Sequence, residues 1–248
     1  MAIYIGSQKV IPHGISEVYV GSQLVYSAEP EYSSTLANNT WDTIKIGIYK
    51  GRASGLGWLG QVKDGYMLVD LQNNRYEKTD GTGYTKAVFM KQYLLSDKYP
   101  LNSTASNIGG WGAMSLKTTL NSTIYNGLST DIKNVISQCK VKSTASGTDS
   151  TINTSDNYLF LISEYELYGA VTYSEGGANE GSPVYDYFNG VGNAYRVMRL
   201  SAGAAGQIYW NRSMYAGRTD YGCLVGNGGA PNRASATGSY YVAPCFAI

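Results

Sequence analysis

Helical periodicity in this chain is concentrated in one stretch, which lies among short apolar runs separated by glycines. Between Ala113 and Gln138 an apolar residue recurs at every fourth position: Leu116, Leu120, Ile124, Leu128, Ile132 and Ile136. This spacing predicts helix. Asn126-Gly127 predicts a helix end, and Ser129-Thr130-Asp131 predicts the cap of a new helix. We therefore expect two helices here.

Outside this stretch the pattern favours strands and loops. Four runs are strand-like, namely Ile44–Tyr49, Gly57–Val62, Gly65–Leu71 and the continuous apolar run Tyr158–Ile162. The polar stretch Thr144–Asp156 predicts a loop, and the glycine-rich and tyrosine-rich remainder predicts short strands between long loops. The fold class we expect is α+β, with two helices and irregular, loop-rich antiparallel β structure.

The N-terminal residues contain an internal repeat. IYIGSQKV at 3–10 returns as VYVGSQLV at 18–25, each copy alternating around Gly-Ser. Gly-Ser suits a two-residue hairpin turn, so we expect two small β-hairpins in residues 1–27, joined at Pro12-His13-Gly14. Two hairpins bury little surface alone. We expect them to serve attachment or oligomerisation, followed by a polar linker at 28–40 and a main domain at 41–248.

Bulk composition excludes several classes of function. The net charge is +1 and only 15% of residues are charged, which argues against nucleic-acid binding. No apolar run is long enough to predict membrane insertion, and no secretory signal is visible. The single histidine, His13, and three widely spaced cysteines exclude most zinc sites. We expect no metal site and no cofactor, although calcium held by Asp156, Glu164 or Glu175 stays open.

The C-terminal forty residues have the composition of a recognition surface. Lysine stops at Lys142, and beyond it only arginine supplies positive charge. Tyr, Gly, Ser and Asn make up 17 of residues 209–248. Lysine and glutamate are depleted at interface centres, whereas tyrosine and arginine are enriched there, and antibody loops use the same mixture. A turn-rich β region with half-buried tyrosines is the alternative interpretation.

Catalytic chemistry has two sets of candidates. Glu164 and Glu166 would share one face of a strand and could act as an acid–base pair, with Glu175, Glu180 and Asp186 as further carboxylates. A structural role is the alternative, in which one carboxylate pairs with Arg196, Arg199 or Arg212. Cys223 is a candidate nucleophile. Cys223 and Cys245 either form a disulfide or remain two buried thiols.

Scattered anchor residues resemble an uncharacterised domain family of gut bacteria, prophages and phage tails. The resemblance covers roughly residues 41–248 and is carried by Tyr99-Pro100-Leu101-Asn102, Gly109-Gly110-Trp111, Ser115-Leu116, Leu120-Asn121, Ile136, Leu159–Ser163 with Glu164 and Glu166, Trp210-x-Arg212-Ser213 and Val242-x-Pro244-x-Phe246-x-Ile248. That family looks like a branch of the C-type-lectin-like fold shared with formylglycine-generating enzymes. The hairpin repeat is similar to segments that precede domains in phage tail proteins.

The resemblance implies where a ligand would bind. In the variable proteins of diversity-generating retroelements, which share this fold, mutable residues near the C-terminus form the binding face. Carried onto this sequence, the scaffold positions are Trp111, Trp210, Arg212, Ser213, Val225, Gly228, Val242, Pro244 and Phe246. The ligand-binding positions are Asn211, Met214, Tyr215, Arg218, Asp220, Tyr221, Asn227, Asn232, Arg233, Tyr240 and Tyr241. A lectin calcium motif and a close cysteine pair are both missing.

The function these observations favour is a non-enzymatic receptor-binding protein, an adhesin on a phage or prophage tail tip or on a bacterial cell surface. Its partner would be a host cell-surface protein or glycan. The hairpins would pack either against the main domain or against another copy of the chain, and a homotrimer is one assembly of the second kind. The alternative is a carboxylate- or cysteine-dependent enzyme of the formylglycine-generating-enzyme-like superfamily.

Overall fold

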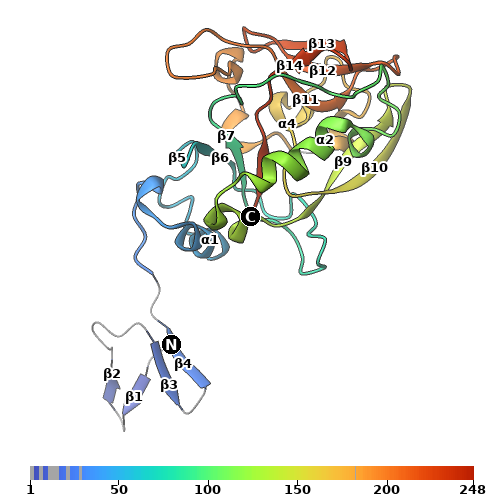
Figure 1. The fold of residues 1–248 in the computed structure, drawn as a ribbon. Coiled ribbons are helices and arrows are strands. Elements are labelled where there is room, and N and C mark those ends of the chain that lie inside the picture. Colours follow the sequence, from blue (N-terminus) through green and yellow to red (C-terminus); the bar gives the residue numbers. More distant parts are fainter. Residues whose placement is uncertain (1–2, 6–7, 11–16, 21–22, 28–29, 182) are drawn as a thin grey trace. The chain divides into compact units, whose positions relative to one another are not determined.

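The computed structural model describes residues 3–5, 8–10, 17–20, 23–27, 30–181 and 183–248, and it divides into two compact units, 1–33 and 34–248 (Figure 1). In the first unit β1 (Ile3–Ile5) pairs with β2 (Gln8–Val10) and β3 (Glu17–Val20) with β4 (Gln23–Ser27), both antiparallel. These are the strand pairs that the repeat predicts. The Gly-Ser turns and the Pro12-His13-Gly14 connection lie outside the described residues.

The second unit begins before the predicted domain start. Residues 34–40 were expected to belong to a linker, but they form part of this unit and include a 3₁₀ turn at Leu36–Asn38. The Leu36 side chain is fully buried, and its backbone N–H donates to Gln61 at 2.8 Å. An apolar residue within a polar stretch therefore anchors this segment to the core.

Helix α1 (Trp41–Tyr49) corrects the expectation of a strand at Ile44–Tyr49. The Thr40 hydroxyl accepts from the Thr43 N–H at 3.1 Å and caps the helix N-terminus. Trp41, Ile44 and Ile48 are buried at helical spacing, whereas Ile46 remains 39% exposed. The alternating isoleucines imitate a strand, but their burial follows the helical period.

The predicted pair of helical segments is present between residues 115 and 135. Helix α2 (Ser115–Thr119) continues into a π-helical turn (Leu120–Ile124), and α3 (Thr130–Val135) follows. The Ser129 hydroxyl caps α3 by accepting from the Ile132 N–H at 3.4 Å. Four α-helices occur in the part of the chain that the structure describes, rather than the two expected, because α1 and α4 (Glu164–Tyr168) also form.

The core is built around a four-stranded antiparallel sheet in the order β15-β7-β6-β5. Its strands are β5 (Val62–Lys63), β6 (Tyr66–Asp70), β7 (Val88–Lys91) and β15 (Cys245–Ala247). Phe246 stacks on Phe89 with ring centroids 5.3 Å apart and meets the edges of Trp41 and Tyr66. The C-terminal strand is thus a central element of the core.

A long hairpin replaces the loop expected at Thr144–Asp156. β9 (Cys139–Ser146) pairs with β10 (Asp149–Asn157) around Gly147. Alternate residues of β9 are buried against the domain, while β10 is mostly exposed and therefore polar. Because β10 buries almost none of its side chains, it needs no alternation of apolar and polar residues, and its sequence therefore resembles a loop.

The remaining strands gather at the end of this unit that lies away from α1 (Figure 1). β11 (Tyr209–Met214), β12 (Tyr221–Val225) and β13 (Pro231–Ser235) form an antiparallel sheet, and β8 (Tyr99–Pro100) pairs with β14 (Ser239–Tyr240). The 3₁₀ turns lie at Trp111–Ala113, Gly177–Glu180, Asp186–Phe188 and Asn193–Arg196. Within the predicted strand Tyr158–Ile162, residues 159–162 are buried and Tyr158 is half-buried, but only Phe160 forms a β-bridge, with Cys245.

The fold class is α+β, with antiparallel sheets and long connections. Among the described residues, no helix has the length and apolar character needed to cross a membrane.

Candidate functional site

Three tyrosines and two arginines from separate segments meet on the β11–β12–β13 sheet, and we call this group the tyrosine–arginine cluster (Tyr173, Tyr215, Arg218, Tyr221 and Arg233). The Tyr215 ring lies 5.8 Å from that of Tyr173 and 6.0 Å from that of Tyr221. The Arg233 guanidinium lies 4.6 Å from the Tyr173 ring centroid and 5.5 Å from that of Tyr215. Arg218 lies 4.2 Å from the Tyr221 ring centroid.

The two arginines of the cluster are exposed, and the tyrosines are half-buried. Arg218 forms a two-bond pair with Asp220 at 2.8 and 2.7 Å. Stacking of an arginine over an aromatic ring fixes a long side chain at little cost in solvation. The cluster is therefore an ordered, partly apolar surface with its charged groups at the water boundary.

A buried asparagine fixes the loop that connects β11 to β12. Asn107 is fully buried, and its side-chain amide donates to the carbonyl oxygens of Arg218 and Tyr221 at 2.8 and 2.7 Å. Its oxygen accepts from the Gly147 N–H at 3.2 Å. A Cβ at Gly147 would lie 2.0 Å from the Tyr215 carbonyl oxygen, so this close approach requires glycine.

The Tyr173 side of the cluster is held by Glu164. The Glu164 carboxylate accepts from the backbone N–H groups of Thr172, Tyr173 and Ser174, at 2.5 to 3.2 Å. Burial raises the pKa of the Glu164 carboxyl, and these three N–H donors act against that rise. Ser174 forms a β-bridge with Tyr215, which sets Tyr173 beside Tyr215. A buried carboxylate thereby positions one tyrosine of the exposed surface.

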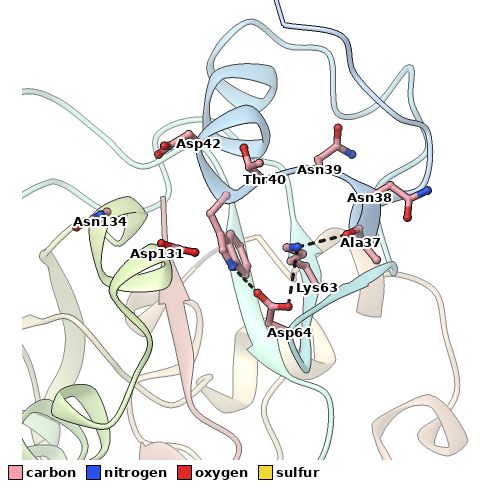
Figure 2. A pocket seen from close by; sticks show the side chains of 10 residues that line it. Ala37, Asn38, Asn39, Thr40, Asp42, Lys63, Asp64, Asp131 and Asn134 are labelled. Carbon is pink, nitrogen blue, oxygen red and sulfur yellow. Dashed lines mark hydrogen bonds and ion pairs between the residues drawn. The ribbon is translucent and has the colours of Figure 1, made fainter.

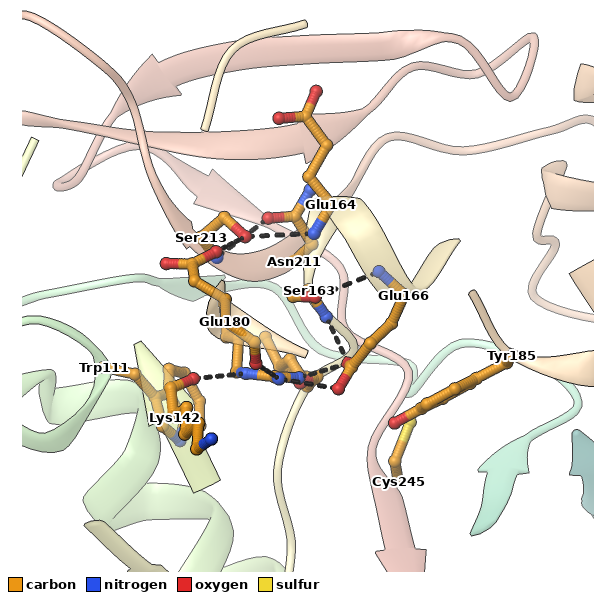
Figure 3. A network of polar contacts seen from close by, with 12 residues as sticks. Trp111, Lys142, Ser163, Glu164, Glu166, Glu180, Tyr185, Asn211, Ser213 and Cys245 are labelled. Carbon is orange, nitrogen blue, oxygen red and sulfur yellow. Dashed lines mark hydrogen bonds and ion pairs between the residues drawn. The ribbon is translucent and has the colours of Figure 1, made fainter. Parts of the chain in front are cut away.

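Beneath the sheet lies a fully buried polar network (Figure 3). Arg212 donates to both oxygens of Glu166, at 2.5 and 2.8 Å, and also to the carbonyls of Lys142, Leu161 and Glu180. Arg212 lowers the pKa of the Glu166 carboxyl although burial alone would raise it. This arrangement satisfies a buried guanidinium almost completely.

Glu180 continues the network toward the cluster. Its carboxylate accepts from the Ser213 and Ser174 hydroxyls and from the Thr144 N–H. Burial raises the pKa of the Glu180 carboxyl, opposed by the hydrogen bond from Ser213 and by the charge of Arg212. Both carboxylate oxygens of Glu180 therefore accept hydrogen bonds from protein donors. The arrangement holds β9, β11 and the 172–180 segment together.

The carboxylates proposed from sequence as an acid–base pair do not share a strand face. Glu164 and Glu166 lie in α4, where Ser163 and Glu166 form a reciprocal capping box, and the two carboxylates bind different partners. The expected pairing of one glutamate with an arginine occurs between Glu166 and Arg212. Within the described ranges, no group of three or more histidines, cysteines or carboxylates is placed to hold a metal ion.

The cysteines are buried as free thiols. Cys223 and Cys245 do not form a disulfide, and neither exposes its sulfur to solvent. Burial raises the pKa of the Cys223 thiol well above its usual range, with the charges of Glu164 and Glu180 adding to that effect. A thiol of this kind is a poor nucleophile.

Not all predicted contact residues join the cluster. Asn211 and Met214 are fully buried in β11, which corrects their assignment to the exposed face. All six residues of β11 are buried, so the strand is covered on both faces and neither side chain reaches the surface. Asn227 is exposed in the turn after β12, and Asn232 is half-buried in β13. Tyr240 packs edge-on to Trp210 at 5.2 Å, in a separate group of side chains.

The second group extends from Tyr240 to Tyr241, whose ring lies 4.9 Å from the Lys98 ammonium. All but one of the positions assigned to the scaffold are buried, namely Trp111, Trp210, Arg212, Ser213, Val225, Val242, Pro244 and Phe246. Gly228 is exposed in the turn after β12, which corrects its assignment. Tyr173 was missed from sequence because it lies 42 residues before Tyr215 in a loop, and no spacing rule connects the two.

A hollow of about 470 Å³ lies at the α1 end of the domain (Figure 2). Its lining is polar, and some of the lining groups are paired: the Trp41 indole N–H donates to Asp64 at 2.8 Å, and Lys63 donates to the Ala37 carbonyl at 3.3 Å. These two contacts join α1 and the segment before it to β5 and the turn that follows it, and so stabilise the α1 end of the domain.

Comparison with known proteins gives one match. No curated protein and no solved structure matches the chain. The model of a domain of unknown function, DUF6273, matches residues 82–248, which include α2–α4, the buried network and the tyrosine–arginine cluster. The chain therefore belongs to the DUF6273 family.

Proposed function

We propose that this chain is a receptor-binding protein without enzymatic activity, whose contact surface is the tyrosine–arginine cluster. One observation carries the proposal. Three half-buried tyrosines, whose rings are tilted against one another, and two exposed arginines form one surface on backbone that is fixed from below by Asn107 and Glu164. Tyrosine and arginine dominate binding hot spots, and rigid support lowers the entropy lost on binding.

The partner we propose is a host cell-surface protein or glycan, and the proposed setting is a phage or prophage tail or a bacterial surface. The proposed architecture of 41–248 is C-type-lectin-like, similar to the variable proteins of diversity-generating retroelements. Four of the five cluster residues lie in the β11–β12–β13 region, within the C-terminal forty residues. This position supports the proposal, because the mutable residues of those proteins lie near the C-terminus.

An enzymatic role is less well supported by the geometry. Glu164, Glu166 and Glu180 all accept hydrogen bonds from protein donors, and the pKa of the Cys223 thiol is raised by burial. These contacts favour structural roles for the residues that an enzyme would need.

The double substitution Tyr215→Ala and Tyr221→Ala tests the proposed surface. We expect binding of the fluorescently labelled protein to a panel of intact gut bacterial cells, read by flow cytometry, to be abolished. The melting temperature should stay within a few degrees, because partly exposed side chains contribute little to stability. Tyr84→Ala is the matched control, since Tyr84 is 46% exposed and lies outside the cluster. Unchanged cell binding in the double variant would refute the assignment.

The hairpin unit gives a second prediction. We propose that it mediates attachment or trimer formation, because two hairpins bury too little surface to be stable alone. Deleting residues 1–33 should leave unit 34–248 folded with an unchanged circular dichroism spectrum and a smaller mass in light scattering. Loss of folding on deletion would show that the hairpins belong to the core of the main domain.

A further inference from the structure

Arg233 differs from the other arginines that contact aromatic rings or carboxylates in this chain. Arg75, Arg212 and Arg218 each face a carboxylate, at Asp70, Glu166 and Asp220 respectively. Arg196 donates three hydrogen bonds to backbone carbonyls. Among the residues that the structure describes, the Arg233 guanidinium meets ring faces and no hydrogen-bond acceptor.

The environment of Arg233 holds the side chain in place while its donors remain available. Arg233 lies in the middle of β13 and pairs in register with Cys223 of the central strand β12. Tyr173 and Tyr215 contact the guanidinium through their rings. A guanidinium that contacts rings by its face keeps its edge N–H groups for bidentate recognition of a carboxylate.

The charge around Arg233 favours an anionic group. Asp220, the carboxylate of the same surface, is engaged by Arg218 through two hydrogen bonds. Glu164, which lies beneath Tyr173, has its oxygens directed to backbone N–H groups. The cluster therefore presents one arginine that is neutralised internally and one that is not.

We propose that Arg233 anchors a carboxylate, the side chain of an aspartate or glutamate on a protein partner, and that Tyr173 and Tyr215 pack against the apolar atoms beside it. This inference rests on the proposed function of the cluster as a binding surface. A protein partner fits because the arrangement of arginine among tyrosines on a sheet face has the composition of a protein–protein hot spot. Complementary charge supplies specificity at such a site.

A displayed random-peptide library tests this inference on the full chain. Selection on immobilised wild-type protein should enrich peptides that carry Asp or Glu next to an apolar residue. Selection on R233Q should lose that acidic enrichment. R199Q is the matched control, because Arg199 is an exposed arginine that lies outside the tyrosine–arginine cluster and its guanidinium bonds only to the Val197 carbonyl oxygen among the described residues. The inference would be overturned if selection on the wild type enriched peptides without acidic residues. It would also be overturned if selection on R233Q enriched the same acidic peptides as selection on the wild type.

A thermodynamic cycle on one selected peptide makes the test quantitative. R233Q should weaken its Kd about tenfold or more, whereas R199Q should change it less than about threefold. Replacing the acidic residue of the peptide by its amide should weaken the Kd by the same factor. When R233Q is combined with the amide peptide, the two losses of affinity should not multiply. Fully multiplicative losses would show that the two groups do not meet. Equal melting temperatures of the variants establish that folding is unchanged.

The remaining outcomes separate this inference from the proposed function. Wild-type retention only of carboxylate-bearing sugars on a glycan array, lost in R233Q, would contradict a protein partner. Retention of neutral peptides or sugars that is lost in the Tyr215→Ala, Tyr221→Ala double variant would refute the role of Arg233 while supporting the surface. Absence of any retained peptide or sugar would count against both proposals.

Discussion

Replacing Glu166 by Gln is expected to destabilise the domain by about 3–5 kcal/mol, the range for breaking a buried ion pair. The substitution keeps the shape of the side chain but leaves the Arg212 charge, which is fully buried, without its carboxylate. Chemical denaturation of wild type and E166Q would measure the loss. E77Q is the matched control, because Glu77 pairs with Lys140 at the surface and the exposed pair contributes little. A loss for E166Q as small as that for E77Q would contradict the assigned role.

The pH dependence of this difference follows from the Glu166 pKa. Arg212 outweighs the effect of burial and lowers that pKa in the folded state. A carboxyl with a lowered folded pKa contributes its full stabilisation above its unfolded value of about 4.3 and loses it as the pH falls toward the folded value. The gap in free energy of unfolding between wild type and E166Q should thus be constant at neutral pH and shrink below about pH 4. A gap that widens on acidification would contradict this direction.

Phe246→Ala is expected to cost about 3–5 kcal/mol of stability, as is typical for truncating a fully buried aromatic side chain. Phe246 contacts Trp41, Tyr66 and Phe89, and these rings belong to α1, β6 and β7. The substitution would therefore leave a cavity where a helix and the central sheet meet. Thermal and chemical unfolding would measure the loss.

Ile46→Ala is the matched control for the Phe246 substitution. Ile46 is an apolar residue of α1 with 39% of its surface exposed, so its truncation should cost well under half as much. An unchanged melting temperature for Phe246→Ala would show that the C-terminal strand is not part of the core.

Local patterns in the sequence account for the helices at 115–135 and for the strand pairs of the repeat. The Ser129 cap and the four-residue apolar spacing each involve residues about one helical turn apart, so both can be recognised from the sequence alone. α1 was misjudged because Ile44, Ile46 and Ile48 alternate as in a strand, and only burial distinguishes the two periods. β10 was missed because a solvated strand needs no apolar face.

The candidate site also contains residues that the sequence reveals and residues that only the fold reveals. Composition pointed to the C-terminal forty residues, which include Tyr215, Arg218, Tyr221 and Arg233, because the depletion of lysine and the enrichment of tyrosine are visible without a fold. Asn211 and Met214 were misassigned because β11 is buried on both faces, so that even its polar positions lie inside the domain. Asn107, Gly147 and Tyr173 act through contacts between residues 40 to 114 positions apart, for which the sequence has no periodic signal.

The anchoring of the β11–β12 loop bears on how the proposed binding surface could acquire a different specificity. Asn107 bonds to carbonyl oxygens of Arg218 and Tyr221, and Gly147 lies against the carbonyl oxygens of Tyr215 and Arg218. These contacts recognise main-chain atoms, which every amino acid supplies, and not the side chains that face solvent. Randomising positions 215, 218, 221 and 233 should therefore yield a library in which most members fold, so that new affinities arise without new compensating substitutions inside the domain.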